Sequence, residues 1–191
     1  MTASTIPQKL DLSKRLQGNI CKTRAAEVKS NAVTGHISIN KDERFMQEAL
    51  AEAEKAMEAG EVPVGAVLVE GDEIIGRGHN EPLSSHDPTA HAEITAIREA
   101  SLVKKNYRLT GCELYVTLEP CAMCLGAAVH ARLKRLVFGA LDPKAGAVES
   151  VMAFPFDKMN HTVEIKGGVL AGECAKILKS FFGKKRQGRV K

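Results

Sequence analysis

Two short clusters in the 191-residue sequence hold the residues best suited to bind a metal and to move protons. In the first cluster His91 and Glu93 are separated by one residue, and in the second Cys121 and Cys124 follow Pro120. Each cluster alone is weak evidence, because a histidine near a helix start usually caps or faces solvent and a lone Cys-x-x-Cys is often redox-active or structural. Together they predict one metal site. Cys121 and Cys124 are three residues apart on one helix face, and His91 offers a third ligand suited to zinc.

The number of ligands separates the possible kinds of site. Three protein ligands leave a tetrahedral zinc ion one open position, which is typical of catalysis. A structural zinc would need a fourth ligand, and the other cysteines, Cys21, Cys112 and Cys174, are isolated in the sequence. A redox-active thiol pair is the second alternative, but it would not require His91 and Glu93 nearby. The sequence favours catalytic zinc and leaves both alternatives open.

Glu93 is the carboxylate best placed to move a proton. Residues two apart on a helix point to nearly opposite sides, so His91 and Glu93 can serve one site only across the N-terminal end of their helix. The cysteine pair also lies near a predicted helix start, and two helix N-termini favour thiolates electrostatically. A carboxylate beside a metal-activated water, but not bound to the metal, can accept its proton. The alternative is a solvated acid on the helix surface.

The elements that must position these residues are predicted from hydrophobic spacing. A helix is expected from a cap signal at Asn40 to a stop signal at Gly60. Further helices are expected from a start at 87–89 to about residue 102, from Pro120 onward, and over 172–182, with 80–88 as a loop. Strands are expected over 64–70, 73–79, 112–118, 135–139 and 161–166. Because strands alternate with helices, the pattern implies a sheet covered on both faces.

Charge is distributed unevenly along the chain. Hydrophobic residues make up 44% of the sequence, enough for one globular core, and the formal net charge is +4. Residues 1–40 carry six basic and two acidic residues, whereas residues 176–191 carry seven basic residues and no acidic one. The intervening part is therefore acidic. We expect a basic and flexible N-terminal extension over 1–40, a folded domain over 41–183 and a basic tail over 184–191.

Composition also excludes some classes of protein. No apolar run approaches the roughly 18 residues that a membrane span needs, and the first 30 residues lack the apolar core of a secretion signal. Five cysteines do not form a dense disulfide framework, which favours reduced thiols or metal ligands and a cytoplasmic location. For residues 1–40, a disordered arm is favoured over a targeting segment.

The spacing His-x-Glu followed by Pro-Cys-x-x-Cys resembles the zinc nucleobase deaminase superfamily. This spacing does not distinguish cytosine, guanine and adenine as the target. The flanking segments are similar to the bacterial tRNA-specific adenosine deaminases, and the resemblance covers about residues 42–183. These segments are 61–67, 86–94, 106–109, 114–121, and 138–140 before Asp142.

The resemblance implies a three-layer α/β/α sandwich of the cytidine deaminase type, with a five-stranded mixed sheet, and a homodimer. It implies one zinc ion per chain, bound by His91, Cys121 and Cys124. The implied substrate is adenosine at the wobble position of a tRNA anticodon stem-loop, with inosine as product. A zinc-bound hydroxide would attack C6 of the flipped adenine, and Glu93 would shuttle protons before ammonia leaves.

Five further positions match the family less specifically. Asn80 matches a position that contacts the target nucleoside, and its alternative role is an asparagine in a turn. Asp142 and Lys144 match a loop near bound RNA, and Phe181 and Phe182 match aromatic positions of the last helix. A local or core role is an equal alternative for these four. The basic C-terminal segment would contact phosphates, or would be a solvated tail.

Two other functions remain as alternatives at this stage. A deaminase of a free base or nucleotide, of the cytosine or guanine type, would share the zinc cluster without needing a basic tail. A non-enzymatic zinc module would bind RNA without forming inosine.

Overall fold

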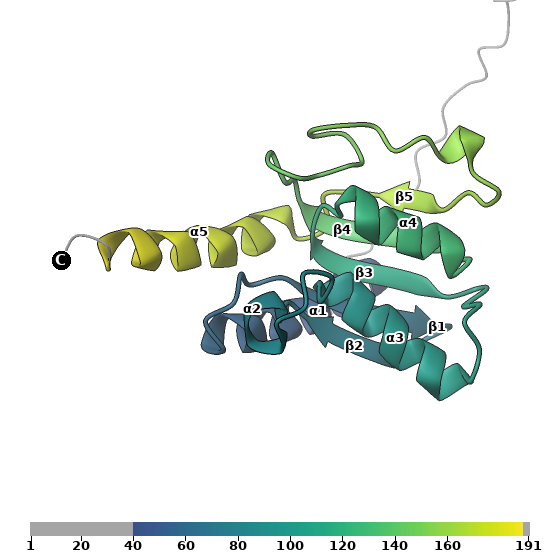
Figure 1. Ribbon diagram of the computed structural model, residues 1–191, viewed down its shortest axis with the longest axis horizontal. Helices are drawn as coiled ribbons and strands as arrows, with labels where there is room; N and C mark the ends of the chain where they lie inside the picture. Colours follow the sequence, from purple (N-terminus) through teal and green to yellow (C-terminus); the bar gives the residue numbers. More distant parts are fainter. Residues whose placement is uncertain (1–39, 189–191) are drawn as a thin grey trace, which may run out of the picture. The chain divides into compact units, whose positions relative to one another are not determined.

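The computed structural model describes residues 40–188, in which one five-stranded sheet carries helices on both faces (Figure 1). Residues 1–39 and 189–191 lie outside this range, and with them Cys21, nearly all of the expected N-terminal extension and the end of the expected tail. The elements in chain order are α1 (Lys41–Glu58), β1 (Gly65–Glu70), β2 (Glu73–His79), α2 (Pro82–Ser85), α3 (Ala92–Lys104), β3 (Glu113–Leu118), α4 (Ala122–His130), β4 (Arg135–Ala140), the 3₁₀ helix η1 (Phe156–Lys158), β5 (Glu164–Lys166) and α5 (Ala171–Gln187).

The sheet is mixed, with the strand order β2-β1-β3-β4-β5. Strand β1 runs antiparallel to both β2 and β3, whereas β3, β4 and β5 are parallel to one another. In the register of the central parallel pair, Leu118 at the end of β3 lies opposite Ala140 at the end of β4. The segments that follow these two strands therefore leave the sheet at the same edge. This architecture confirms the predicted fold class.

Alternation along the strands divides the apolar residues between two cores. One core packs Ala66, Leu68, Leu114 and Val116 of the sheet against α3 and α4. The other core packs the intervening residues, among them Val67 and Tyr115, against α1 and α5. Each face of the sheet is covered by two of the helices longer than one turn, as expected for a three-layer sandwich.

Two glycines of β2 let α3 lie unusually close to the sheet. A Cβ atom at Gly76 would collide with the backbone of Ala96, and one at Gly78 would collide with the backbone of Ala92. Only glycine leaves room for this approach. The first turn of α3, which carries the predicted site residues, is thereby held against the end of β2.

The structure corrects the predicted start of α3. The helix begins at Ala92 instead of at 87–89, because Asp87 forms a local turn in which its Oδ1 accepts hydrogen bonds from the backbone nitrogen (2.8 Å) and hydroxyl (2.7 Å) of Thr89. The capping acceptor comes instead from the end of β2. Asn80 Oδ1 accepts from the backbone nitrogen of Ala92 at 3.0 Å. His91 thus becomes the residue immediately before the helix.

Other element bounds differ from the sequence expectation by about one turn. The expected loop at 80–88 contains the short helix α2, and α4 starts at Ala122 rather than at Pro120. The last strand is reduced to Glu164–Lys166, and α5 continues through residues 184–187, which were expected to belong to the tail. Within residues 40–188, no helix combines the length and the apolarity needed to cross a bilayer.

A buried carboxylate joins α1 to the three parallel strands at the sheet edge far from the ends of β3 and β4. Asp42, only 5% exposed, accepts hydrogen bonds from Arg135 at 2.8 and 2.9 Å, from Tyr115 at 3.0 Å and from Lys166 at 2.6 Å. The Arg135 hydrogen bonds lower the pKa of Asp42 well below its usual range, against the opposing effect of burial. The ionised form is therefore the one that folding favours.

We expect Asp42→Asn to lower the free energy of unfolding at pH 7 by about 3 kcal/mol, because Arg135 and Lys166 would lose their shared counter-charge. Since the folded-state pKa of Asp42 is lowered, its contribution is complete above the unfolded pKa of about 3.9 and is lost as the pH falls below it. The difference in the free energy of unfolding between wild type and variant, measured by urea denaturation, should become smaller below about pH 4. A constant difference across pH would contradict this account. Asp72→Asn, at an 81% exposed carboxylate, is the control and should change stability by less than about 0.5 kcal/mol.

Candidate metal centre

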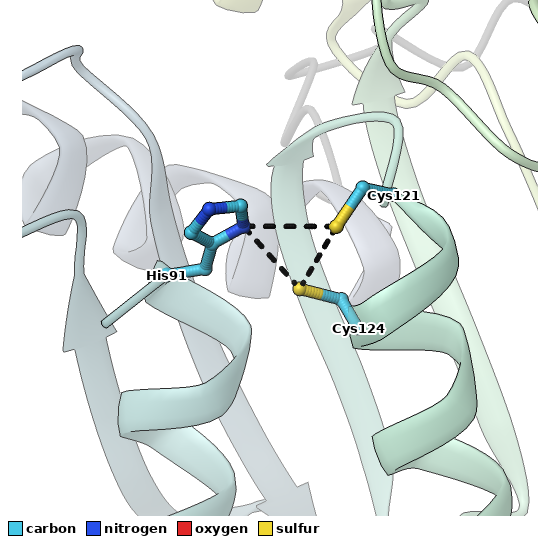
Figure 2. Close-up of side chains that lie close together, drawn as sticks. All are labelled: His91, Cys121 and Cys124. Atoms are coloured by element: carbon cyan, nitrogen blue, oxygen red, sulfur yellow. Dashed lines mark hydrogen bonds between the residues drawn. The ribbon is translucent and has the colours of Figure 1, made fainter. Parts of the chain in front are cut away.

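One histidine and two cysteines meet where two neighbouring helices begin (Figure 2). His91 is the N-cap residue of α3, Cys121 is the N-cap residue of α4, and Cys124 lies in the first turn of α4. The Nδ1 atom of His91 lies 3.7 Å from Sγ of Cys121 and 3.6 Å from Sγ of Cys124, and the two sulfur atoms are 3.6 Å apart. The structure therefore brings together the three residues that the sequence singled out, here termed the His-Cys-Cys group.

The donor set and its spacing fit zinc. A tetrahedral ion with Zn–S bonds of about 2.3 Å and Zn–N bonds of about 2.0–2.1 Å separates its donors by roughly 3.6–3.8 Å. The three separations in the structure agree with these values. The described residues contribute three such donors, so the group matches a site with one position open and could hold a metal ion.

A small pocket of about 160 Å³ opens beside this group. Glu93, in the first turn of α3 and only 4% exposed, lines it together with His91 and Cys121. The predicted geometry, in which His91 and Glu93 reach one site across the end of their helix, is present. The remaining lining residues are Val62, Val64, Asn80, Leu118, Glu119, Asp142 and Ala145.

The electrostatics of the pocket favour one thiolate next to a buried acid. The hydrogen bond between the two cysteine side chains lowers the pKa of Cys121 to about 4 and raises that of Cys124. The hydrogen bond with Cys121 raises the pKa of His91, and burial raises the pKa of Glu93. The N-terminal ends of α3 and α4 also favour negative charge at this point. These are conditions under which a soft cation binds thiolate ligands readily.

The weaker sequence candidates fall into two groups. Asn80 lines the pocket, and its side chain also accepts the hydrogen bond from Ala92 that fixes the start of α3. Asn80 therefore combines a structural role with a position in the pocket. Asp142 lines the same pocket. Lys144 and Phe182 lie further out, with Lys144 Nζ 5.5 Å from the centre of the Phe182 ring. Phe181 is 6% exposed, and its ring packs edge-on against the ring of Phe182.

A groove continues from the pocket toward α5. It shares Val62, Leu118 and Asp142 with the pocket, and its outer part runs between the segment after β4 and the exposed side of α5. Phe182 and Leu178 give it an apolar floor. Its cationic residues, here termed the basic groove, are Lys144, Lys179, Lys185 and Arg186.

Sequence reasoning missed Glu119 as a functional candidate. It is 2% exposed, lines the pocket and precedes the Pro120–Cys121 step. Burial alone would raise its pKa, but hydrogen bonds from Glu149 and Ser150 lower it to about 2. The sequence did contain one signal for Glu119. It directly follows a strand that is apolar and predicted to be buried, and burying an unpaired charge there would cost free energy.

A five-stranded mixed sheet with this His-Cys-Cys group at two helix starts defines the class of cytidine-deaminase-fold proteins. The sequence model of the MafB19-like deaminases matches residues 39–186. The chain belongs to this family and, within it, to the tRNA-specific adenosine deaminases.

Three comparisons support this assignment. A protein of Haemophilus influenzae named tRNA-specific adenosine deaminase is 55% identical over 148 residues, covering 76% of this chain and 86% of that protein. A Bacillus subtilis protein of the same name is 47% identical over 150 residues, covering 78% and 93%. A solved structure from studies of A-to-I editing by tRNA:A34 deaminases at the wobble position of transfer RNA has a TM-score of 0.68 and 47% identity, covering 71% of this chain and 99% of its own.

Proposed function

We propose that this protein converts adenosine to inosine at the wobble position of a tRNA anticodon by hydrolytic deamination. Deamination of tRNA adenosine follows from its family. The wobble position, the zinc ion and the roles of individual residues are the parts that we propose. The observation that carries them is the His-Cys-Cys group beside a buried Glu93 in one small pocket.

His91, Cys121 and Cys124 would hold one zinc ion per chain, since their donor atoms have the chemistry and spacing that it requires. Bound there, zinc supplies Lewis-acid activation of a water molecule at its open position. The pocket has room for one base and little more. The target adenine would therefore have to leave its stack to reach the group, as in other nucleobase deaminases.

Glu93 carries the protons in this proposal. It lies two residues after His91 in the same pocket and is not one of the three donors of the group. Its carboxylate accepts a proton from the attacking water and delivers it to the ring nitrogen N1, and it then moves the second proton, from the hydroxyl formed on C6, to the amino nitrogen so that ammonia can leave. Because the side chain is almost fully buried, the proton stays in the site between these two transfers.

RNA contacts would spread from the pocket into the basic groove. Asn80 uses its amide oxygen on Ala92, which leaves its amide nitrogen as a donor for the nucleoside. Asp142 borders both the pocket and the groove, and Phe182 offers an aromatic face to a neighbouring base. The cationic side chains of the groove, including Lys144, would contact phosphates of the anticodon loop.

Two further expectations follow from the same resemblance. We propose a homodimer, which sedimentation equilibrium of the purified protein measures directly. We also propose a cytoplasmic location, which suits the absence of disulfide bonds among the cysteines of the described range, Cys112, Cys121, Cys124 and Cys174.

The test of function uses purified zinc-loaded protein and separate substrates. We expect inosine to form in an anticodon stem-loop with adenosine at the wobble position, and not in the same stem-loop with guanosine there. Free cytosine, cytidine and guanine should release no ammonia above background. Turnover of a free base without turnover of the stem-loop would replace the proposal with a free-base deaminase. Stem-loop binding without any inosine would indicate a non-enzymatic RNA-binding module.

Neutralising the basic groove should weaken RNA binding in a salt-dependent way. The triple variant Lys179→Gln, Lys185→Gln and Arg186→Gln keeps α5 intact, which truncation after Phe182 would not. We expect the slope of log Kd against log salt concentration for a stem-loop to become shallower by about 2, since each phosphate contact contributes about 0.7 on single-stranded RNA.

The control for this experiment neutralises two exposed cations at the opposite sheet edge, Arg44→Gln with Lys134→Gln. This control should leave the slope unchanged. A triple variant with the wild-type slope would remove the groove from the RNA interface.

A further inference from the structure

The loop after β4 folds around one buried carboxylate, that of Glu119. The 15 residues between Ala140 and Phe156 contain no helix or strand, and residues 141–151 of this segment are here termed the Glu119 loop. Oε1 of Glu119 accepts hydrogen bonds from three successive backbone nitrogens, those of Val148 (3.0 Å), Glu149 (2.8 Å) and Ser150 (3.1 Å). Long loops without secondary structure are held in one conformation only by such specific contacts.

The second oxygen holds both ends of the same loop. Oε2 of Glu119 accepts from the backbone nitrogen of Asp142 at 3.0 Å and from the hydroxyl of Ser150. The backbone nitrogen of Ala147 donates to the carbonyl of Pro120 at 2.9 Å, next to the carboxylate. Five donors from a folded-back loop thus converge on one side chain that is 2% exposed.

The Glu119 loop forms one wall of the substrate pocket. Asp142 and Ala145 line the pocket beside His91 and Glu93, and Lys144 lies in the basic groove. Glu119 itself lies two residues before Cys121, on the segment that enters α4. One residue therefore connects the element that carries the metal ligand to the loop that closes the pocket.

We propose that Glu119 is a positioning residue for substrate binding, which holds Asp142 and Ala145 in the pocket wall that receives the target nucleoside. This role rests on the proposed function of the same pocket. Glu119 does not touch the reacting atoms in this account. If its acceptor is lost, the loop occupies its seated conformation only part of the time, and the apparent affinity falls by that fraction.

Glu119→Gln keeps the shape of the side chain but sets an amide NH₂ group against backbone donors. We expect KM for the stem-loop to rise about tenfold or more, since charged hydrogen-bond acceptors are lost, while kcat stays within about threefold. Zinc content should remain at one ion per chain. Hydrogen–deuterium exchange should become faster in residues 142–150 and remain unchanged in α4. Glu119→Asp, which retains the charge, should give an intermediate KM.

A second variant perturbs the same contact from the loop side. A Cβ atom at the buried Gly146 would collide with the Glu119 carboxylate, so Gly146→Ala should displace the loop and also raise KM. Because both substitutions break one contact, the double variant should raise KM by less than the product of the two single effects. Asp42→Asn is the control for a buried carboxylate remote from the pocket, and it should lower stability without changing KM.

The outcomes separate this inference from the proposed function. A wild-type protein that forms no inosine in the stem-loop refutes the proposed function. Hydrogen–deuterium exchange of Glu119→Gln still tests whether Glu119 holds the loop. Unchanged exchange in residues 142–150 would show that it does not. An active variant with normal KM, or one that loses zinc and kcat together, would overturn the positioning role.

Discussion

Replacing Glu93 by glutamine is expected to lower kcat for inosine formation by about 10³-fold while the chain keeps its zinc, because general acid–base catalysis typically contributes 10²–10⁴-fold. Glutamine has nearly the same shape as glutamate, and Glu93 is not one of the three donors of the His-Cys-Cys group. The substitution would therefore remove the proposed proton carrier and leave the three proposed ligands in place. Single-turnover inosine formation and elemental analysis of the same sample measure the two quantities.

The matched control lies on the same helix. Glu99 is an exposed carboxylate of α3 that accepts a hydrogen bond from the backbone of Arg77, away from the pocket. Glu99→Gln should retain kcat within about twofold, because Glu99 is exposed and outside the pocket, and surface substitutions of this kind usually change stability little. If Glu93→Gln deaminates at close to the wild-type rate, Glu93 is not the proton carrier. If Glu93→Gln loses zinc, Glu93 contributes to metal binding, which contradicts its assignment as a proton carrier outside the ligand set.

Local patterns were sufficient to predict a sheet covered on both faces and to select His91, Glu93, Cys121 and Cys124 as candidates, whereas the cytidine deaminase type of fold came from the family resemblance. The apolar run of β1, the alternation of β2 after a turn, and the placement of His91 and Cys121 at helix starts are properties of short segments. Such segments reveal their periodicity and capping signals in the sequence itself. The two helix starts converge because α3 links β2 to β3 across β1 and α4 links β3 to the adjacent β4, so both helices begin at the same end of the sheet.

The start of α3 shows where local signals fail. Asp87 and Pro88 both resemble helix-start residues, yet Asp87 closes a turn onto Thr89, and the helix is capped by Asn80, twelve residues before Ala92. A residue with a short polar side chain satisfies a turn and a cap equally well. The choice between them was made by the packing of α3 against β2, which sequence spacing does not describe.

The role of Glu119 could not be deduced from its local sequence signal for a similar reason. Its partners at 148–150 lie about 30 residues further along the chain, in a segment with no regular periodicity. The basic groove likewise joins Lys144 to Phe182 across 38 positions. Contacts of this kind depend on the parallel pairing of β3 with β4, which brings both strand ends to one edge. They become visible only when the register of the sheet is known.

Cys121→Ala should abolish both metal binding and turnover. The variant leaves His91 and Cys124 as the two remaining donors, and two ligands do not hold zinc against solvent and chelators as three do. Elemental analysis should fall from one zinc per chain to nearly none. Inosine formation should fall to background, since the activated water disappears with the ion. Because a ligand bound only by the folded state stabilises it, added zinc should raise the Tm of the wild type and not that of the variant.

The matched control is another buried cysteine changed to the same residue. Cys174 lies in α5 beneath Gly139, on the opposite face of the sheet from α4, and its thiol is free. Cys174→Ala removes one sulfur atom from the core and should cost about 1 kcal/mol of stability while zinc content and kcat remain unchanged. The pair of variants separates loss of a ligand from loss of packing. One tightly bound zinc ion in Cys121→Ala would mean that Cys121 is not a ligand, and the catalytic centre would have to be built from other residues.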